Sequence, residues 1–513
     1  MDEGPSMRSR MSSARRLPQL LVGVAVFAMF LPVLVVPYGF SDDYTVLWME
    51  DSKQPTVEFG KNMLQITAVT GRALSGLVDD LLFPAAGTVA NLRLIRLVAV
   101  LATIGVALLL RRELVRAGVH QAAAVLIAIA VAGLPAFQVF ASWAVMVGAP
   151  IAALLAGSAS AVALSSLGAA RTHVLDRLAA ATVLLLAAMQ LYQPGAMFFW
   201  VLLAVALLGA RQDGTRAVRA IRVHAAVAFV AFGLSYVVLK LSIHLIGPSV
   251  AGANRAQLTH DIAGKAGWFA RVPLERSFGL FDLTPSPWLS AGVGTFAAVG
   301  LLVWIWRSAA RPLLYTGVAV ALVPLCYLPN LLTVEDLGQF RTIVSLSSLA
   351  VLYVSFAAMG LWLSVRARVR AGLGQQAVDR LQQVLLATAV LIVAFGAVRA
   401  AENVTTRFAV PQLTEHRLLR NQVLGLAPAV SRIGFIQTPW NGGMGAAVPN
   451  DDEFGLPSST QPWTLEPAVL LVLREAGRLT GGRQPIVDVL SPYSDVFPNN
   501  EPRLDLRSLL ALR

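Results

Sequence analysis

Two adjacent carboxylates, Asp42 and Asp43, follow directly on the first long apolar run of the chain, in the stretch PYGFSDDY. Carboxylates beside membrane hydrocarbon are costly unless they are solvated, paired or bound to a metal. One interpretation is structural, because Ser and Asp both suit a helix N-cap and acidic groups favour a helix N-terminus. The other is chemical: a general base, or a ligand for a hard divalent cation that also holds a phosphate.

The composition indicates where these residues lie. Of 513 residues, 56% are apolar and only 14% are charged, whereas about a quarter are charged in soluble globular chains. The chain is therefore expected to be a polytopic membrane protein. Its net charge of +12 comes mostly from arginine, which collects in cytoplasmic loops, so we do not interpret it as nucleic-acid binding. Cys326 is the only cysteine, which excludes an intramolecular disulfide.

About eleven apolar segments have a length suited to crossing a membrane. The first ends near Val36, and the others lie near 92–110, 120–139, 144–168, 178–191, 195–210, 223–246, 288–306, 312–332, 343–364 and 381–400. Arginine-rich loops alternate with loops that lack Lys and Arg, which predicts a cytoplasmic Met1 and a C-terminal region outside. The segments at 178–191 and 195–210 form two crossings or one broken helix. The Arg- and Ala-rich composition suggests a bacterial protein of the cytoplasmic membrane.

Three long stretches then fall on the outer face: 38–91, 247–287 and everything after about 401. In the loop 38–91, apolar residues recur every three or four positions, which predicts an amphipathic helix on the membrane surface. The last stretch is polar and rich in turns, with strand patterns at 430–437 and 485–490 and a helical pattern at 466–479. The predicted fold is an α-helical membrane domain over 1–400 and a small extracytoplasmic α/β domain over 401–513.

This plan resembles the GT-C class of membrane glycosyltransferases, in particular the bacterial glucosyltransferases that decorate O-antigen. A looser likeness links it to cell-wall arabinosyltransferases. The matching features are many spans, a large first outer loop, an outer C-terminal domain and three motifs. These motifs are Phe40-Ser41-Asp42-Asp43-Tyr44 after the first span, Gly71-Arg72 in the loop, and Leu191-Tyr192-Gln193-Pro194 at an outer helix end.

The resemblance implies transfer of a sugar from a polyprenyl-phosphate donor to a glycan or lipid-linked acceptor on the outer face, with inversion. It also implies that Asp42 or Asp43 acts as the base or binds a divalent cation such as Mg²⁺, Mn²⁺ or Ca²⁺. The sequence does not distinguish the two aspartates. The donor phosphate would need cations, and arginine suits it because its guanidinium donates two hydrogen bonds to phosphate oxygens.

Six cations lie in segments assigned to the outer face: Arg72, Arg255, Lys265, Arg271, Arg276 and Arg341. We select Arg72, Arg341 and Arg255 for the donor phosphate, with local ion pairing as the alternative for each. Arg93 and Arg96 begin the second span against the positive-inside trend, so they either snorkel to lipid headgroups or meet the phosphate.

Other outer-face residues suit a sugar substrate. Tyr192 and Gln193 would contact sugar hydroxyls, or else mark an interfacial tyrosine and a proline-driven helix break. Four tryptophans near this face would stack on sugars or simply anchor the interface: Trp268, Trp288, Trp440 and Trp463. The acidic run 451–453 is expected to be a solvated loop, with calcium binding as its alternative.

Two other functions compete with a transferase. A transporter or flippase of a lipid-linked glycan would carry ionisable residues at mid-membrane depth, and the predicted spans contain almost none. A non-enzymatic scaffold would tolerate loss of both aspartates. No nucleotide-binding fingerprint occurs in the sequence, so a nucleotide-sugar donor inside the cell is not expected.

Overall fold

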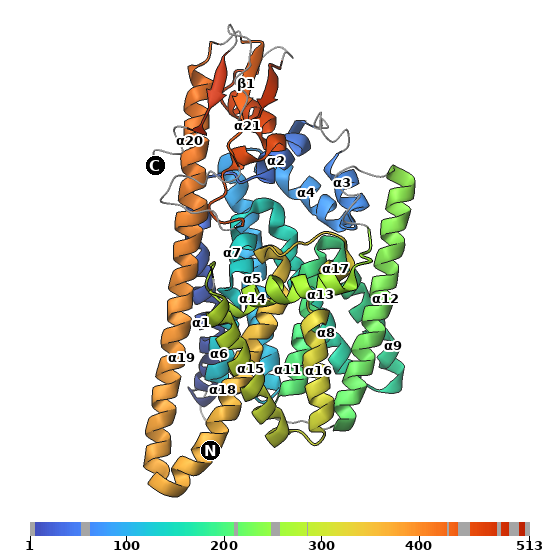
Figure 1. Cartoon of the computed structure of the whole chain (residues 1–513), viewed down its shortest axis with the longest axis vertical. Helices are drawn as coiled ribbons and strands as arrows, with labels where there is room; N and C mark the ends of the chain where they lie inside the picture. Colours follow the sequence, from blue (N-terminus) through green and yellow to red (C-terminus); the bar gives the residue numbers. More distant parts are fainter. Residues whose placement is uncertain are drawn as a thin grey trace.

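The protein is a long helical bundle with a small sheet at one end (Figure 1). The computed structural model describes residues 6–52, 62–209, 214–247, 257–284, 286–427, 430–439, 452–479, 484–491 and 502–507. The sheet and helix α21 (Pro462–Glu475) lie at one end, and the turn between α18 (Val344–Leu373) and α19 (Gln375–Asn403) lies at the other. Chemistry carried by the C-terminal region is therefore confined to one end of the bundle.

Eight helical stretches in the described residues are long and apolar enough to cross a membrane. Two of them lie on α18 and α19. The other six lie on α1 (Ser6–Val35), α5 (Leu92–Arg116), α8 (Gly148–Ser166), α9 (Arg171–Leu191), α12 (Gly214–Ile246) and α15 (Pro287–Ser308). A ninth is the pair α6 (Gln121–Ala132) and α7 (Pro135–Ser142), bent by 57°. Two shorter apolar helices, Gln193–Leu208 and Pro312–Leu325, complete the positions of the eleven predicted segments.

The outer surface of the bundle is apolar. Phe229 is 82% exposed, Trp288 is 87% exposed and Leu391 is 69% exposed, each on a helix at the periphery. Soluble proteins rarely expose apolar patches of this extent. Facing hydrocarbon, these side chains are in a favourable environment, which agrees with the predicted polytopic membrane fold.

The predicted segments 178–191 and 195–210 form two helices that run in opposite directions. We call the end of the bundle that carries the arginine-rich loops the arginine-rich end; there, Arg177 Nη1 of α9 donates to the carbonyl of Ser165 near the end of α8, at 2.6 Å. At the opposite end, Gln193 Nε2 donates to the carbonyl of Gly71, at 2.7 Å. The chain then returns through α10 (Gln193–Ala196) and α11 (Phe198–Leu208), so that Gly209 packs against Ala117 at the arginine-rich end.

The first outer loop is helical, but it is not one helix. It contains α2 (Asp42–Ser52), α3 (Met63–Val69), α4 (Ala73–Ala86) and η1 (Val89–Asn91). Gly71 separates α3 from α4 with φ +75°, a conformation that glycine adopts without strain. Leu77 and Leu81 face outward, 49% and 73% exposed, whereas Asp79 is buried. The inward face of α4 therefore carries one buried carboxylate, Asp79, among Gly76, Phe83 and Ala86.

The C-terminal region begins without a break in the helix. The long helix α19 continues through a π-helical stretch, Val404–Ala409, into α20 (Val410–Gly425), so the boundary predicted at 400–401 falls inside it. The strands β1 (Arg432–Ile436), β2 (Ile486–Leu490) and β3 (Arg503–Asp505) form a parallel sheet in the order β2-β1-β3. The two predicted strands and the predicted helix are present, and β3 is an addition.

Short helices close the same end of the bundle. They are η2 (Ala144–Val147), α13 (Ile262–Arg271), α14 (Pro273–Phe278), α17 (Leu328–Leu332), η5 (Phe340–Ile343) and η7 (Ser458–Thr460). They lie in the loops between the bundle helices or in the C-terminal region, whereas α16 (Pro312–Leu325) runs within the bundle. The loops around η2 and η5 contribute Trp143 and Arg341 to the site described next.

Candidate functional site

Asp43 is completely buried and fully hydrogen-bonded. Its Oδ2 accepts from the backbone N–H of Phe40 at 3.1 Å and from Arg96 Nη2 at 3.2 Å, and its Oδ1 accepts from the N–H of Val145 at 3.0 Å. Burial raises the pKa of Asp43 from the usual 3.8 to about 6, although the Arg96 charge and the backbone donors oppose the rise. A carboxylate held in this way positions other groups.

Arg96 is the buried counter-ion of Asp43. Besides that pair, its Nη2 donates to the carbonyl of Tyr38 at 2.7 Å, and its Nε donates to the carbonyl of Ser142 at 3.0 Å. The guanidinium also lies 3.6 Å from the centre of the Tyr38 ring. These contacts tie the start of the first loop to α5 and to the end of α7. Arg96, which departs from the positive-inside trend, is thus a buried partner of Asp43.

Asp42 points away from Asp43 and stays partly exposed. Its Oδ1 accepts from Trp463 Nε1 at 2.6 Å and from Ser41 Oγ at 3.4 Å. Ser41 has φ +48°, an uncommon conformation for a residue with a side chain, and its N–H donates to Ser458 Oγ at 2.9 Å. This turn sends one carboxylate into the bundle and directs its neighbour toward the C-terminal region.

Residues 452–463, which we call the strap, cover this end of the bundle. Asp452 Oδ2 accepts from Arg276 Nη1 at 3.2 Å and from the N–H of Phe340 at 2.9 Å. Glu453 is 3% exposed, so this part of the acidic run is not the solvated loop expected from the sequence. Asp451 lies outside the described residues. Glu415 of α20 fixes the middle of the strap, because its carboxylate accepts from two consecutive backbone N–H groups there, at 2.7 and 2.8 Å.

Arg341 meets the strap above the first loop. Its Nη1 lies 3.3 Å from Glu453 Oε1, and its guanidinium lies 5.0 Å from the centre of the Trp143 ring. Asp42 and Tyr192 are both within electrostatic range of this guanidinium. Burial raises the pKa of Glu453 well above its usual value, although the Arg341 charge opposes the rise. Arg341 therefore pairs with Glu453, and Asp42 and Tyr192 act on it electrostatically.

The remaining predicted residues are placed as follows. Gln193 is hydrogen-bonded to Gly71, which joins two of the motifs named above. Arg72 precedes α4, and its charge acts on the buried Asp79. Burial and the nearby charge of Glu50 raise the pKa of Asp79 well above its usual value, although Arg72 opposes the rise. Arg255 lies outside the described residues.

The pair Asp42 and Asp43 does not provide a ready two-carboxylate cation site. Both oxygens of Asp43 already accept hydrogen bonds, so joint binding of a cation would require it to exchange them for the metal. In the described part of the chain, no group of three or more His, Cys, Asp or Glu side chains is arranged to hold a metal. Asp42 alone offers a partly exposed carboxylate, and no step below is assigned to a cation.

The sequence did not predict three of the contacts at this site: those of Arg96 with Asp43, of Glu453 with Arg341 and of Trp463 with Asp42. Arg96 did carry a signal, since a cation at the outer start of a span requires an anionic partner. Glu453 and Trp463 carried none beyond their residue type, because their contacts join positions more than 100 residues apart in the chain.

Comparisons with known proteins give a distant structural similarity. No protein-family model matches the chain, and no curated protein matches it. Among solved structures, the chain is similar to the crystal structure of the Archaeoglobus fulgidus oligosaccharyltransferase in complex with Zn and sulfate. The identity is 14% and the TM-score 0.44, over 83% of this chain and 60% of the archaeal chain. The residue roles proposed below rest on the geometry of this chain.

Proposed function

We propose that this protein is a membrane glycosyltransferase of GT-C type. It transfers a sugar from a polyprenyl-phosphate donor to a glycan or lipid-linked acceptor on the outer face of the bacterial cytoplasmic membrane. The observation that carries the proposal is that a partly exposed carboxylate, Asp42, and a guanidinium, Arg341, both contact the strap, through Trp463 and Glu453, at the end of the bundle that bears the C-terminal region. One group suits a base, and the other suits a phosphate leaving group.

In the proposed reaction, Asp42 accepts the proton of the acceptor hydroxyl. The hydroxyl oxygen forms a bond to the anomeric carbon as the bond from that carbon to the phosphate oxygen breaks, so a single displacement inverts the configuration. The electron pair of the broken bond stays on polyprenyl phosphate. Arg341 stabilises the negative charge that develops on this phosphate. Arg72 would supply a second cation from the side of Gly71 and Gln193.

Asp43 and Arg96 are assigned a positioning role. Their ion pair fixes the backbone on both sides of Ser41, and that backbone aims Asp42 at the strap. A general base works only within hydrogen-bond reach of the proton that it removes. Rigid support from a buried neighbour is one way to keep Asp42 in that geometry.

The strap holds both proposed reactive groups in this structure. Trp463 donates to Asp42, and the carboxylate of Glu453 lies where a phosphate oxygen would approach Arg341. A donor phosphate would replace the Glu453 carboxylate at Arg341, and an acceptor hydroxyl would replace the Trp463 indole at Asp42. We assign Trp143 and Tyr192 to the sugar ring, because the Trp143 ring lies 5.0 Å from the Arg341 guanidinium and Tyr192 acts electrostatically on the same guanidinium.

The envelope glycan of a deletion strain tests this function. Glycan composition is compared among the parent, the deletion strain, and deletion strains carrying the parental gene or Asp42→Asn. We expect one sugar substituent to disappear on deletion, to return with the parental gene and to stay absent with Asp42→Asn at equal protein level. If the deletion changes no glycan, or if Asp42→Asn restores it fully, the proposal is wrong. If the protein were a flippase, the strain that carries Asp42→Asn would regain the sugar substituent.

A further inference from the structure

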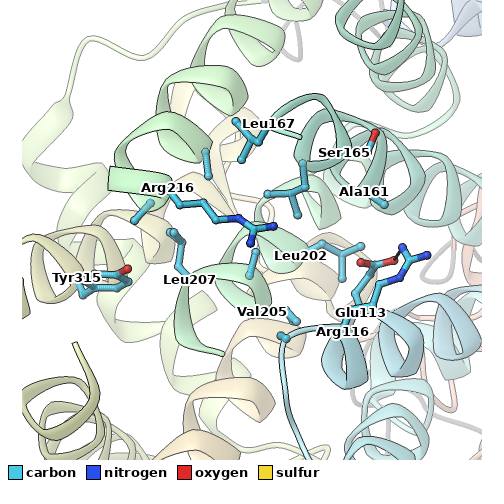
Figure 2. Close-up of a pocket in the computed structure, with 15 residues that line it drawn as sticks. Glu113, Arg116, Ala161, Ser165, Leu167, Leu202, Val205, Leu207, Arg216 and Tyr315 are labelled. Carbon is cyan, nitrogen blue, oxygen red and sulfur yellow. Dashed lines mark hydrogen bonds and ion pairs between the residues drawn. The ribbon is translucent and has the colours of Figure 1, made fainter. Parts of the chain in front are cut away.

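A cavity of about 290 Å³ opens at the arginine-rich end of the bundle (Figure 2). It lies among the C-terminal ends of α5, α8 and α11 and the N-terminal ends of α12 and α16. Arg116, on its wall, ends the helix that carries Arg96 near its start. Twenty residues of α-helix span about 30 Å, so this cavity is far from Asp42 and plays no part in the proposed transfer.

The rim of the cavity is cationic. Arg216 points into the space from the first turn of α12, and Arg116 lies across from it beside Glu113 (Figure 2). Glu113 is already neutralised, because its Oε1 accepts from Arg112 Nε and Arg116 Nη1, each at 2.9 Å. Within the described part of the chain, Arg216 forms no hydrogen bond or ion pair. The rim therefore keeps an excess of positive charge and one uncommitted guanidinium.

The floor of the cavity is apolar. Leu202, Val205 and Leu207 of α11 line it together with alanines from α8 and α12. The N-terminal end of α12 forms one side of the cavity, and farther along this helix Phe229 and Val237 are 82% and 59% exposed, so α12 lies at the periphery of the bundle. Basic pockets between transmembrane helices near the membrane surface suit anionic lipid headgroups. A small soluble anion would gain nothing from the apolar floor.

We infer that this cavity binds an anionic phospholipid from the leaflet on the arginine-rich side. The headgroup phosphate lies between Arg216 and Arg116, and the glycerol and upper acyl chain lie against Leu202 and Leu207. Arginine suits this role because its guanidinium donates two parallel hydrogen bonds to phosphate oxygens. The lipid would also fill the space between five helix ends and hold them together.

Lipid binding to the purified protein tests the inference, independently of transferase activity. The protein is placed in nanodiscs of phosphatidylcholine with increasing phosphatidylglycerol, and the bound lipid is measured by native mass spectrometry. We expect Arg216→Gln to weaken phosphatidylglycerol binding at least about tenfold, from the loss of a charge-assisted contact. Arg219→Gln is the matched control, since Arg219 is an exposed arginine of α12 outside the cavity lining. It should bind as the parent does.

A second variant separates this site from general surface attraction. Ala161→Leu would fill part of the cavity and leave every charge in place, so it should also lose the bound lipid. Equal losses in Arg216→Gln and Arg219→Gln, or full binding by Ala161→Leu, would contradict a lipid in the cavity. Displacement of the lipid by inorganic phosphate or glycerol phosphate at comparable concentration would also contradict it, because the site would then recognise a free phosphate.

Discussion

Removing Arg96 should destabilise the protein severely, because it leaves Asp43 buried without its counter-ion. Both side chains are fully buried, and the Nη2–Oδ2 distance is 3.2 Å. Breaking a buried pair from one side typically costs about 3–5 kcal/mol. Whole domains are stable by only about 5–15 kcal/mol. We therefore expect Arg96→Met to lose a large fraction of its free energy of unfolding at neutral pH.

The size of this loss should depend on pH in a defined direction. The pKa of Asp43 is already raised by burial to about 6 in the folded protein, from 3.8. A raised pKa means that the stability contributed by this carboxyl is fully present below pH 3.8 and is lost as the pH rises through about 6. Without Arg96 the pKa of Asp43 rises further, so the deficit of the variant shrinks by about 1.4 kcal/mol per pH unit as the pH falls from the pKa of Asp43 in the variant to about 6, its pKa in the parent.

The assay is denaturant-induced unfolding in detergent, followed by tryptophan fluorescence at several pH values. Arg93→Met is the control, because Arg93 is an exposed arginine one turn earlier on the same helix and should change stability by less than about 0.5 kcal/mol. Adding Asp43→Asn to Arg96→Met should recover part of the loss, since no buried charge then remains. A loss that is independent of pH, and that the second substitution increases, would refute the buried ion pair.

Three further predictions follow from the site and the topology. Arg341→Gln should raise the donor KM about 10- to 100-fold by removing a charge-assisted contact with the phosphate, with a smaller effect on kcat. Glu453→Gln should lower the donor KM, because it removes the carboxylate that competes for the same guanidinium; an unchanged or higher KM would show that the strap does not compete. A reporter active only outside the cytoplasm, fused after Arg513, should be active, and a silent but well-expressed fusion would contradict the predicted orientation.

The sequence predicted the scaffold well because its signals are local. Apolar segments long enough to cross a membrane have few alternatives to helix in lipid, and each predicted segment is helical in the structure. The C-terminal strands at 432–436 and 486–490 were also recognisable from short apolar runs between turn residues. The helix break at Gly71 was missed, since the apolar repeat continues across it.

The different environments of Asp42 and Asp43 could not be predicted from the sequence. Neighbours in a chain share their local pattern, whereas burial of Asp43 depends on Arg96 and on the backbone of Val145, both distant in sequence. The hydrogen bond of Asp42 spans 421 positions to Trp463. Only tertiary packing distinguishes the carboxylate that supports the turn from the one that faces the strap.

The central claim, that Asp42 is the general base, is tested most directly by the transfer rate of purified Asp42→Asn with a polyprenyl-phosphate sugar. Asparagine keeps the size of the side chain and an oxygen that accepts from Trp463, but it cannot take up a proton. General-base assistance contributes about 100- to 10,000-fold in rate, so we expect a loss in that range with an unchanged unfolding midpoint. Transfer at a near-parental rate by Asp42→Asn would contradict the account.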